Sequence, residues 1–293
     1  MAGEVTTVID PDKCTGCGLC VKVCPAGTLS MKDGKAAVTG TRSMGCGQCA
    51  AVCPEGAVSV GALDGHSFDL ATIGPTDRWV PWGEPDAAEL VALMRSRRSC
   101  RSYTKERVRR EALDDLARIG TSAPTATNSQ RWAFTILPTR EDVERLGAGV
   151  AAFFRRLNRL ARSRFVRLFS RSLREYYRAY YSTVEGALDE WEHEGRDRLF
   201  HGATAAIVVT SRPGASFPAD DCLLATQNIL LAAHAMGLGT CLIGFAVKAM
   251  ELDRRVARAV EIPDEETTHS VIALGHPAVR YARGIDRRTP AIR

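Results

Sequence analysis

The chain has 293 residues, enough for one large domain or two of ordinary size. Its content of 45% hydrophobic and 25% charged residues is typical of a globular protein and excludes a disordered or fibrous one. The net charge of +5 is too small to indicate nucleic-acid binding, so we expect no such partner. No secretory signal or membrane-length apolar run is visible, so we expect a cytoplasmic location.

The ten cysteines are distributed unevenly. Seven lie between Cys14 and Cys53, whereas Cys100, Cys222 and Cys241 are scattered. In a chain without an export signal, such clustering indicates metal ligation rather than a disulfide framework.

An internal repeat organises the clustered cysteines. A shift of 29 positions lays nine residues of the first half on identical residues of the second, from Gly16 on Gly45 to Ser30 on Ser59. Each half ends in Cys-Pro. The first half reads Cys14-x2-Cys17-x2-Cys20-x3-Cys24-Pro25.

This spacing is typical of ligands to cubane iron–sulfur clusters. Three thiolates at this spacing wrap one cluster, and the fourth, before proline, ligates the other cluster. The sequence therefore resembles two-cluster bacterial ferredoxins over about residues 5–62, and we expect a ferredoxin-like domain at 1–63. A zinc ribbon is the alternative, but it does not need this run of cysteines. The first cluster is assigned Cys14, Cys17, Cys20 and Cys53; the second is assigned Cys24, Cys46, Cys49 and Ser43.

Ser43 departs from the ferredoxin pattern, because it stands where the repeat predicts a cysteine. A hydroxyl is a harder and poorer donor than a thiolate for such a cluster. Three outcomes stay open for the second cluster: a serine-ligated [4Fe–4S], a [3Fe–4S], or a [4Fe–4S] with water or another ligand on one iron. The first cluster is expected to be an ordinary [4Fe–4S].

Residues 64–85 are predicted to form an ordered linker, since Trp79 and Trp82 favour burial. A helix is predicted to start after Asp86, which is followed by Glu89 in a capping-box arrangement. The pattern further predicts helices near 110–119 and 219–236, and strands at 133–137, 205–210 and 270–274.

Four segments in the remaining chain together resemble the nitroreductase-like flavoprotein family over about residues 88–293. They are an arginine–serine segment at 97–103, a polar loop at 122–132, a Gly-Leu-Gly segment at 237–244 and a basic pair near the C-terminus. The resemblance implies an α+β domain at 86–293, bound FMN and an intertwined homodimer. Guanidinium forks and a hydroxyl suit a phosphate group.

The resemblance also implies which residues hold FMN. Arg97, Arg98, Ser99 and Arg101 would bind the phosphate and nearby polar atoms, and Arg287 or Arg288 would complete this clamp. Asn128 and Gln130 would contact the flavin edge, while Leu242, Ile243 and Gly244 would pass beside the ring. Arg131 departs from the family, which usually has proline there. No catalytic residue is assigned, since flavin supplies the hydride and His201, His234 and His269 are interpreted as structural.

An arginine-rich excursion at about 148–198 contains a pattern that predicts one long helix over 151–181. Its arginine stripe is interpreted as a solvated basic face across the flavin pocket. Docking of an acidic redox partner is a second interpretation. Contact with an anionic membrane surface or an acidic substrate is a third.

These features predict an FMN-dependent reductase that is fed by reduced ferredoxin or another low-potential donor. The expected substrate is a small electrophilic organic molecule: a nitroaromatic, a quinone, an activated alkene or a halogenated ring. Two alternatives stay open, a non-catalytic electron-transfer subunit that docks a redox partner and a dehydrogenase that runs the same chain in reverse.

Overall fold

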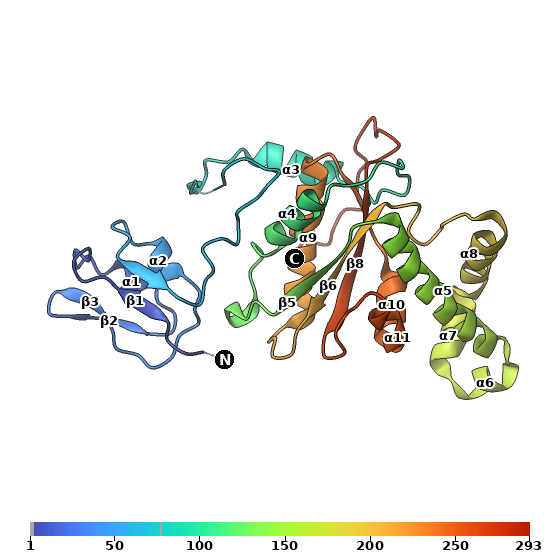
Figure 1. Ribbon diagram of the computed structural model, residues 1–293, viewed down its shortest axis with the longest axis horizontal. Helices are drawn as coiled ribbons and strands as arrows, with labels where there is room; N and C mark the ends of the chain where they lie inside the picture. The colour runs from blue at the N-terminus through green and yellow to red at the C-terminus, as the bar shows by residue number, and fades with distance from the viewer. Residues whose placement is uncertain (1–2, 77) are drawn as a thin grey trace. The chain divides into compact units, whose positions relative to one another are not determined.

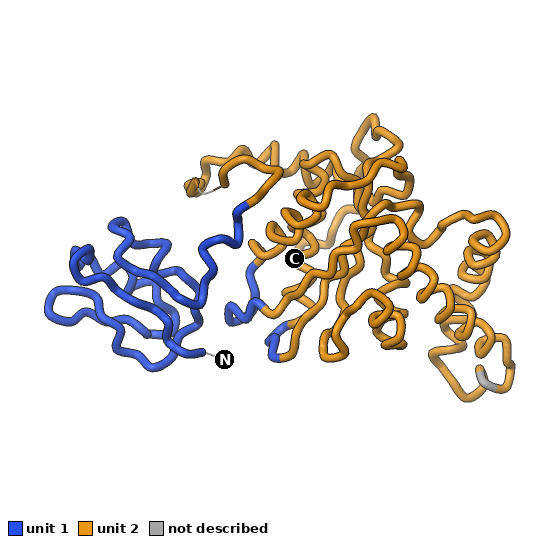
Figure 2. The backbone as a smooth tube through the Cα atoms, in the orientation of Figure 1, with its two compact units in different colours: residues 1–69, 124–130, 214–217 blue, residues 70–123, 131–213, 218–293 orange. Residues whose placement is uncertain are grey.

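The computed structural model describes residues 3–76 and 78–293. The chain divides into two compact units (Figure 2). The first contains residues 1–69, 124–130 and 214–217, and the second contains 70–123, 131–213 and 218–293. Each unit has a hydrophobic core of its own.

The same local structure occurs in both halves of the first unit. Gly18 and Gly47 precede its two short helices with φ of 71° and 73°, in the left-handed region that favours glycine. The two halves therefore enter their helices through the same turn. The elements are β1 (Thr7–Ile9), α1 (Leu19–Val23), β2 (Leu29–Lys32), β3 (Lys35–Val38), α2 (Gln48–Ala51) and β4 (Val58–Val60), with β1 antiparallel to β4 and β2 antiparallel to β3.

The hydrophobic core of the first unit is small. Its buried members are Cys20, Leu29, Ala36, Cys49, Val58 and Val60, so two of the six are predicted cluster ligands. Domains of this size bury too little apolar surface to be very stable alone. We therefore expect metal ligation to contribute to the folding of this unit.

A four-stranded antiparallel sheet is the centre of the second unit (Figure 1). Its order is β5 (Trp132–Leu137), β6 (Ala205–Ser211), β8 (Thr267–Gly275) and β7 (Gly239–Leu242). Every residue of β6 is buried, because helices cover both faces of the sheet. The three predicted strands are confirmed, and β7 is an additional strand within the Gly-Leu-Gly segment.

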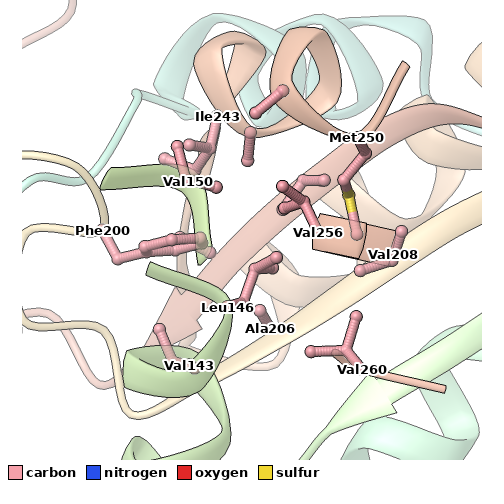
Figure 3. Packing of buried hydrophobic residues seen from close by; sticks show 14 of the residues in the cluster. Val143, Leu146, Val150, Phe200, Ala206, Val208, Ile243, Met250, Val256 and Val260 are labelled. Carbon is pink, nitrogen blue, oxygen red and sulfur yellow. The ribbon is translucent and has the colours of Figure 1, made fainter. Parts of the chain in front are cut away.

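The two faces of the sheet support separate parts of the core. Ile207 packs with α4 (Arg110–Gly120) and α9 (Pro218–Ala235), whereas its neighbours Ala206 and Val208 pack with α5 (Arg140–Arg162). This alternation follows from the two-residue period of a strand. Figure 3 shows the face that α5 covers. Phe200 is also buried there, and so is Met250, which belongs to α10 (Gly244–Leu252). The α+β prediction is confirmed. The second unit also contains the short helix α11 (Arg254–Arg258). The short helix η1 (Ala126–Asn128) belongs to the first unit.

The predicted helix start at Asp86 is also confirmed. Its carboxylate accepts a hydrogen bond from the backbone N–H of Ala88 at 2.7 Å, at the N-terminus of α3 (Ala87–Ser96). By contrast, Trp79 and Trp82 are 73% and 95% exposed, so the prediction that they are buried is wrong. The first half of the linker is held at another point, since the Asp115 carboxylate accepts hydrogen bonds from Ala71 and Thr72.

The single long helix predicted over 151–181 is wrong. The backbone is extended at Ser163 and again at Ser170, whose hydroxyl accepts a bond from the N–H of Leu173. Serine breaks the pattern because its side chain competes with helical hydrogen bonding and favours a cap. The chain instead forms α5, α6 (Arg164–Phe169), α7 (Arg171–Ala179) and α8 (Tyr181–Glu194).

Several arginines of the predicted stripe carry ion pairs rather than a free charge. Arg155 pairs with Glu192, Arg162 with Glu185 and Arg171 with Glu175. The basic face is therefore partly neutralised within the excursion. In the described part of the chain, no helix has the length and apolar content that crossing a bilayer would require.

Candidate cofactor sites

Four predicted ligands line one small cavity of the first unit, here called the first cluster cavity. They are Cys14, Cys17, Cys20 and Cys53. Cys53 comes from the second half of the repeat, so the structure brings together the crossed set that the spacing predicts. Four thiols from the two halves form a donor set that fits a [4Fe–4S] cluster.

The other four predicted ligands line the second cluster cavity. They are Cys24, Ser43, Cys46 and Cys49. Ser43 is only 8% exposed, and its hydroxyl accepts a hydrogen bond from the N–H of Gly45 at 3.1 Å. The backbone of Ser43 also pairs with that of Gly3. Three thiols and a fixed hydroxyl fit a cluster of either nuclearity considered above.

Equivalent backbone donors support the crossed cysteines. The N–H of Thr28 donates to Cys24 Sγ at 3.3 Å, and the N–H of Ala57 donates to Cys53 Sγ at 3.2 Å. Thr28 and Ala57 are themselves related by the shift of 29 positions. Hydrogen bonds to ligand sulfurs orient the ligands and tune cluster potential.

Burial raises the pKa of Cys20 and of Cys49, which are also equivalent in the repeat. A thiolate at either position therefore needs nearby positive charge, which iron supplies. Within residues 3–76 and 78–293, no three His, Cys, Asp or Glu side chains converge as ligands of a single metal ion would. A cubane holds its ligands farther apart than one ion does, since four irons lie between them.

The arginine–serine and Gly-Leu-Gly segments meet in the second unit. The backbones of Ser99 and Thr240 form a parallel bridge, and the N–H of Cys100 donates to the carbonyl of Thr240 at 2.8 Å. A Cβ at Gly239 would lie 2.7 Å from Cys100 Sγ, so this approach requires glycine. The sequence predicted that both segments serve one site, and the structure brings them together.

A cavity of about 550 Å³ lies where these segments meet, and we call it the arginine cavity. Four arginines line it, and no aspartate or glutamate does among the residues that the structure describes; the arginines are Arg97, Arg98, Arg280 and Arg283. The set fits a phosphate group, because guanidinium forks match phosphate oxygens. Sequence reasoning missed Arg280 and Arg283, although the density of arginines near the C-terminus was a usable signal.

The predicted basic pair lies elsewhere. Arg287 and Arg288 are exposed, and neither is among the residues that line the arginine cavity. Their neighbour Asp286 pairs with Arg95 of α3 at 3.2 Å.

A cavity of about 1,100 Å³, here called the large cavity, contains the other end of the Gly-Leu-Gly segment. Leu242, Ile243 and Gly244 line it together with Arg101. Leu242 is 47% exposed between the buried Cys241 and Ile243, so it faces outward from β7. Tyr176, Tyr180, Phe154, Leu157 and Phe245 add an aromatic and apolar wall. The structure thus separates Arg101 from Arg97 and Arg98.

The polar loop at 124–130 belongs to the first compact unit. Its Asn128 has a φ of 53°, and its amide donates to the carbonyls of Met44 and Gly45 at 3.3 and 3.1 Å. Gln130 has a φ of 46°, and its N–H donates to Thr125 Oγ1. Arg131 is exposed. The Asn128 amide thus supports the chain beside Ser43.

The scattered cysteines and histidines have separate environments. Burial raises the pKa of Cys241 and raises that of Cys222 to about 12, which keeps both as thiols. His234 lines the arginine cavity, and His269 lies 2.8 Å from Ser211 Oγ. His201 lines the large cavity, a position that the sequence alone did not indicate.

Comparison with known proteins identifies both parts of the chain. The profile of the nitroreductase family matches residues 94–276, and two profiles of 4Fe-4S binding domains match residues 7–30 and 44–56. The chain belongs to the nitroreductase family. It is an FMN-dependent oxidoreductase with an N-terminal iron–sulfur region, so both resemblances found in the sequence are confirmed.

Individual relatives agree with this assignment. Chloronitrobenzene nitroreductase from Comamonas testosteroni is 27% identical over 207 residues, covering 65% of this chain and 88% of the relative. Ferredoxin-2 from Desulfomicrobium norvegicum is 48% identical over 31 residues, covering 11% of this chain and 52% of the relative. A crystal structure of a nitroreductase with bound FMN from Desulfitobacterium hafniense DCB-2 has the same fold. Its TM-score is 0.52 at 22% identity, with coverage of 70% of this chain and 98% of that one.

Proposed function

We propose that this nitroreductase-family protein takes electrons from a low-potential donor such as a reduced ferredoxin, passes them through its iron–sulfur clusters to FMN, and reduces a small electrophilic organic substrate. One observation carries the proposal: a single chain contains both crossed ligand cavities and the two cavities beside the Gly-Leu-Gly segment. The proposed boundaries are 1–63 for the ferredoxin domain, 64–85 for the linker and 86–293 for the FMN domain.

Within this proposal the arginine cavity binds the FMN phosphate. Arg97 and Arg98 take the role that the sequence suggested, with Ser99 beside them, and Arg280 and Arg283 are added because they line the same cavity. Arg287 or Arg288, Asn128 and Gln130 stay in the proposal through the family resemblance alone.

The large cavity would hold the flavin ring and the substrate. Leu242, Ile243 and Gly244 would border the ring, and Arg101 would face its polar edge. Bound FMN supplies hydride to the substrate. The wall formed by Tyr176 and its neighbours would exclude water and stack against a flat substrate. A nitroaromatic is the favoured substrate because it matches the name of the Comamonas relative; quinones and activated alkenes belong to the same electrophilic class.

Two cluster assignments and an assembly complete the proposal. The first cluster cavity holds a [4Fe–4S], and the second holds a [4Fe–4S] or [3Fe–4S] with Ser43 at the fourth position. The active form is a homodimer, as the family resemblance implies. A walled cavity of this size supports an enzyme over a flat electron carrier.

The test starts with anaerobically purified protein analysed for iron, sulfide and flavin. Reduced ferredoxin and nitrobenzene are then supplied, and the consumption of nitrobenzene is followed. We expect ferredoxin-dependent reduction that falls in Arg97→Ala together with FMN content. Protein that neither carries nor binds flavin contradicts the proposal, and electron flow only from an organic donor to ferredoxin would reverse its direction.

A further inference from the structure

A further cavity, of about 330 Å³, lies between α5 and α8 and adjoins the large cavity. We call it the side cavity. Its walls are largely apolar and include Val150 of α5 and Val184, Leu188 and Trp191 of α8. Six residues line both this cavity and the large cavity, so the two cavities adjoin. Three of the six are polar (Arg101, Arg198 and His201), and the others are Phe154, Leu199 and Phe245.

The outer wall of the side cavity depends on a close approach between helices. A Cβ at Gly147 of α5 would lie 2.6 Å from Cη2 of Trp191 on α8. Only glycine therefore lets the indole pack down on α5. The indole and the helix keep the cavity within the size range of small-molecule sites.

The turn at 197–202 fixes the polar end of the cavity. The Asp197 carboxylate accepts hydrogen bonds from the N–H groups of Leu199, Phe200 and Gly202 at 3.0, 2.7 and 3.1 Å. It also pairs with Arg140 at 2.8 Å. Because Phe200 is fully buried in the core, the turn is anchored from both sides.

His201 occupies an unusual backbone conformation in this turn. Its φ is +58°, in the left-handed region that is uncommon for residues other than glycine, and the hydrogen bonds that Asp197 accepts hold the turn in this conformation. Burial lowers the pKa of His201; the charges of Arg101 and Arg198 lower it further, whereas Asp197 raises it. The ring is therefore neutral near pH 7 and has one N–H to donate.

The charges around the side cavity favour an anion. In the described part of the chain, no aspartate or glutamate lines it, whereas Arg101 and Arg198 do. Glu190, which is not among the lining residues, pairs with Nη1 of Arg198 at 2.7 Å and also with Arg196 at 3.3 Å, so it offsets only part of the positive charge of Arg198 while it fixes the guanidinium. A guanidinium fixed in this way binds a carboxylate well, since little side-chain freedom is lost on binding.

We propose that the substrate is an aromatic acid: its ring lies in the large cavity beside Leu242, its carboxylate is bound by Arg198 and His201, and apolar substituents extend into the side cavity. This rests on the proposed function, in which FMN borders the large cavity. His201 acts as a positioning residue for the substrate, and α8 with its preceding helices sets specificity.

The test compares 4-nitrobenzoate with 4-nitrobenzamide, which differ in charge and little in shape. FMN-loaded protein is reduced with dithionite and mixed anaerobically with each compound. We expect kcat/KM to favour the acid by about tenfold or more. Arg198→Gln should bring this ratio close to one, while Arg198→Lys retains part of it. A ratio near one in the unmodified protein, or a ratio unaffected by Arg198→Gln, overturns the inference.

Two variants at His201 separate binding from backbone effects. His201→Gly removes the ring while fitting the left-handed backbone, and His201→Asn fits it and keeps a donor. We expect His201→Gly to raise KM for the acid about tenfold and His201→Asn to recover part of the loss. The matched control is Glu261→Gly, at an exposed residue that also has a positive φ, of 61°, and it should leave both values unchanged.

A binding measurement distinguishes a failure of the proposed function from a failure of the aromatic-acid site. Benzoate and benzamide, which are not reduced, are titrated into the oxidised protein while the flavin spectrum is followed. Preferential binding of benzoate that is lost in Arg198→Gln supports the aromatic-acid site. Absence of flavin contradicts the proposed function itself. A flavin-loaded protein that binds benzamide as tightly as benzoate contradicts only the further inference.

Discussion

The two cluster cavities have the same local backbone structure but different sets of predicted ligands. Equivalent glycines introduce both short helices, and equivalent N–H groups donate to Cys24 and Cys53. The difference lies at Cys14 in one cavity and Ser43 in the other, which the shift of 29 positions superposes. The two cavities therefore share a local fold and differ first in one predicted donor atom.

The surroundings of these two positions reinforce the difference. Hydrogen bonds from the backbone at Ala36 and Gly16 lower the pKa of Cys14, so they favour the thiolate form of this side chain. Ser43 is instead buried and tied to Gly3 and Gly45. An alkoxide there depends on iron for its charge, since a hydroxyl is far less acidic than a thiol.

Removing iron should have the largest effect and should act on both cavities together. The first unit has a small core that includes Cys20 and Cys49, so we expect it to lose its fold when iron is removed. The second unit, with its sheet covered on both faces, should keep its structure. Hydrogen exchange on the full chain checks this. Protection of residues 7–60 that survives iron removal would show that packing alone holds the first unit.

Cys14→Ser should make the first cavity resemble the second. The substitution replaces a thiolate with the donor found at Ser43, so we expect the first cluster to take on the EPR signature of the second. Iron content and EPR of the reduced and oxidised protein measure this. If the EPR signatures of the two clusters in Cys14→Ser stay as different as in the unmodified protein, the difference between the clusters does not arise from this ligand.

Ser43→Cys is the reciprocal change and should have a smaller structural cost. It supplies the eighth cysteine of the ferredoxin pattern, and we expect about eight irons per chain with two similar [4Fe–4S] signals. The double variant Cys14→Ser/Ser43→Cys serves as the matched control, because it should move the unusual cluster to the first cavity. A [3Fe–4S] signal that persists in Ser43→Cys would contradict the ligand assignment.

Thr28→Ala tests the smallest difference between the halves. Thr28 is 2% exposed and its hydroxyl donates to the carbonyl of Arg42 at 2.7 Å, whereas its repeat equivalent is Ala57. We expect a loss of about 1 kcal/mol in the free energy of unfolding of the first unit. Thermal melting followed at the cluster absorption measures it. A change in the spectrum of the first cluster, rather than in stability, would show that the two cavities are coupled through this loop.

Much of this organisation was predictable because it is encoded locally. Ligand spacing, the Cys-Pro endings and the glycines of the repeat specify which residues share a cluster cavity. The Asp86 cap and the β6 strand also follow from neighbouring residues. The arginine–serine and Gly-Leu-Gly segments were recognised through the family resemblance.

The remaining features depend on contacts between distant residues. The residues adjacent to Trp79 and Trp82 do not indicate that these side chains are exposed, and only the structure shows it. The side cavity requires Gly147 and Trp191, which are far apart in sequence. The role proposed for His201 depends on a turn that Asp197 and Arg140 fix together. Helical periodicity also obscured the break at Ser163, since one serine changes the pattern little.

In the proposed function, electrons enter through the clusters and leave through the flavin. Stopped-flow absorption on anaerobic full-length protein tests it most directly, using reduced ferredoxin first and 4-nitrobenzoate second, with Cys53→Ala for comparison. We predict that the cluster and flavin bands bleach in that order and recover when the nitroaromatic is added, and that the flavin step is slowed at least about tenfold in Cys53→Ala. Bleaching of the flavin at the same rate in Cys53→Ala would contradict the account.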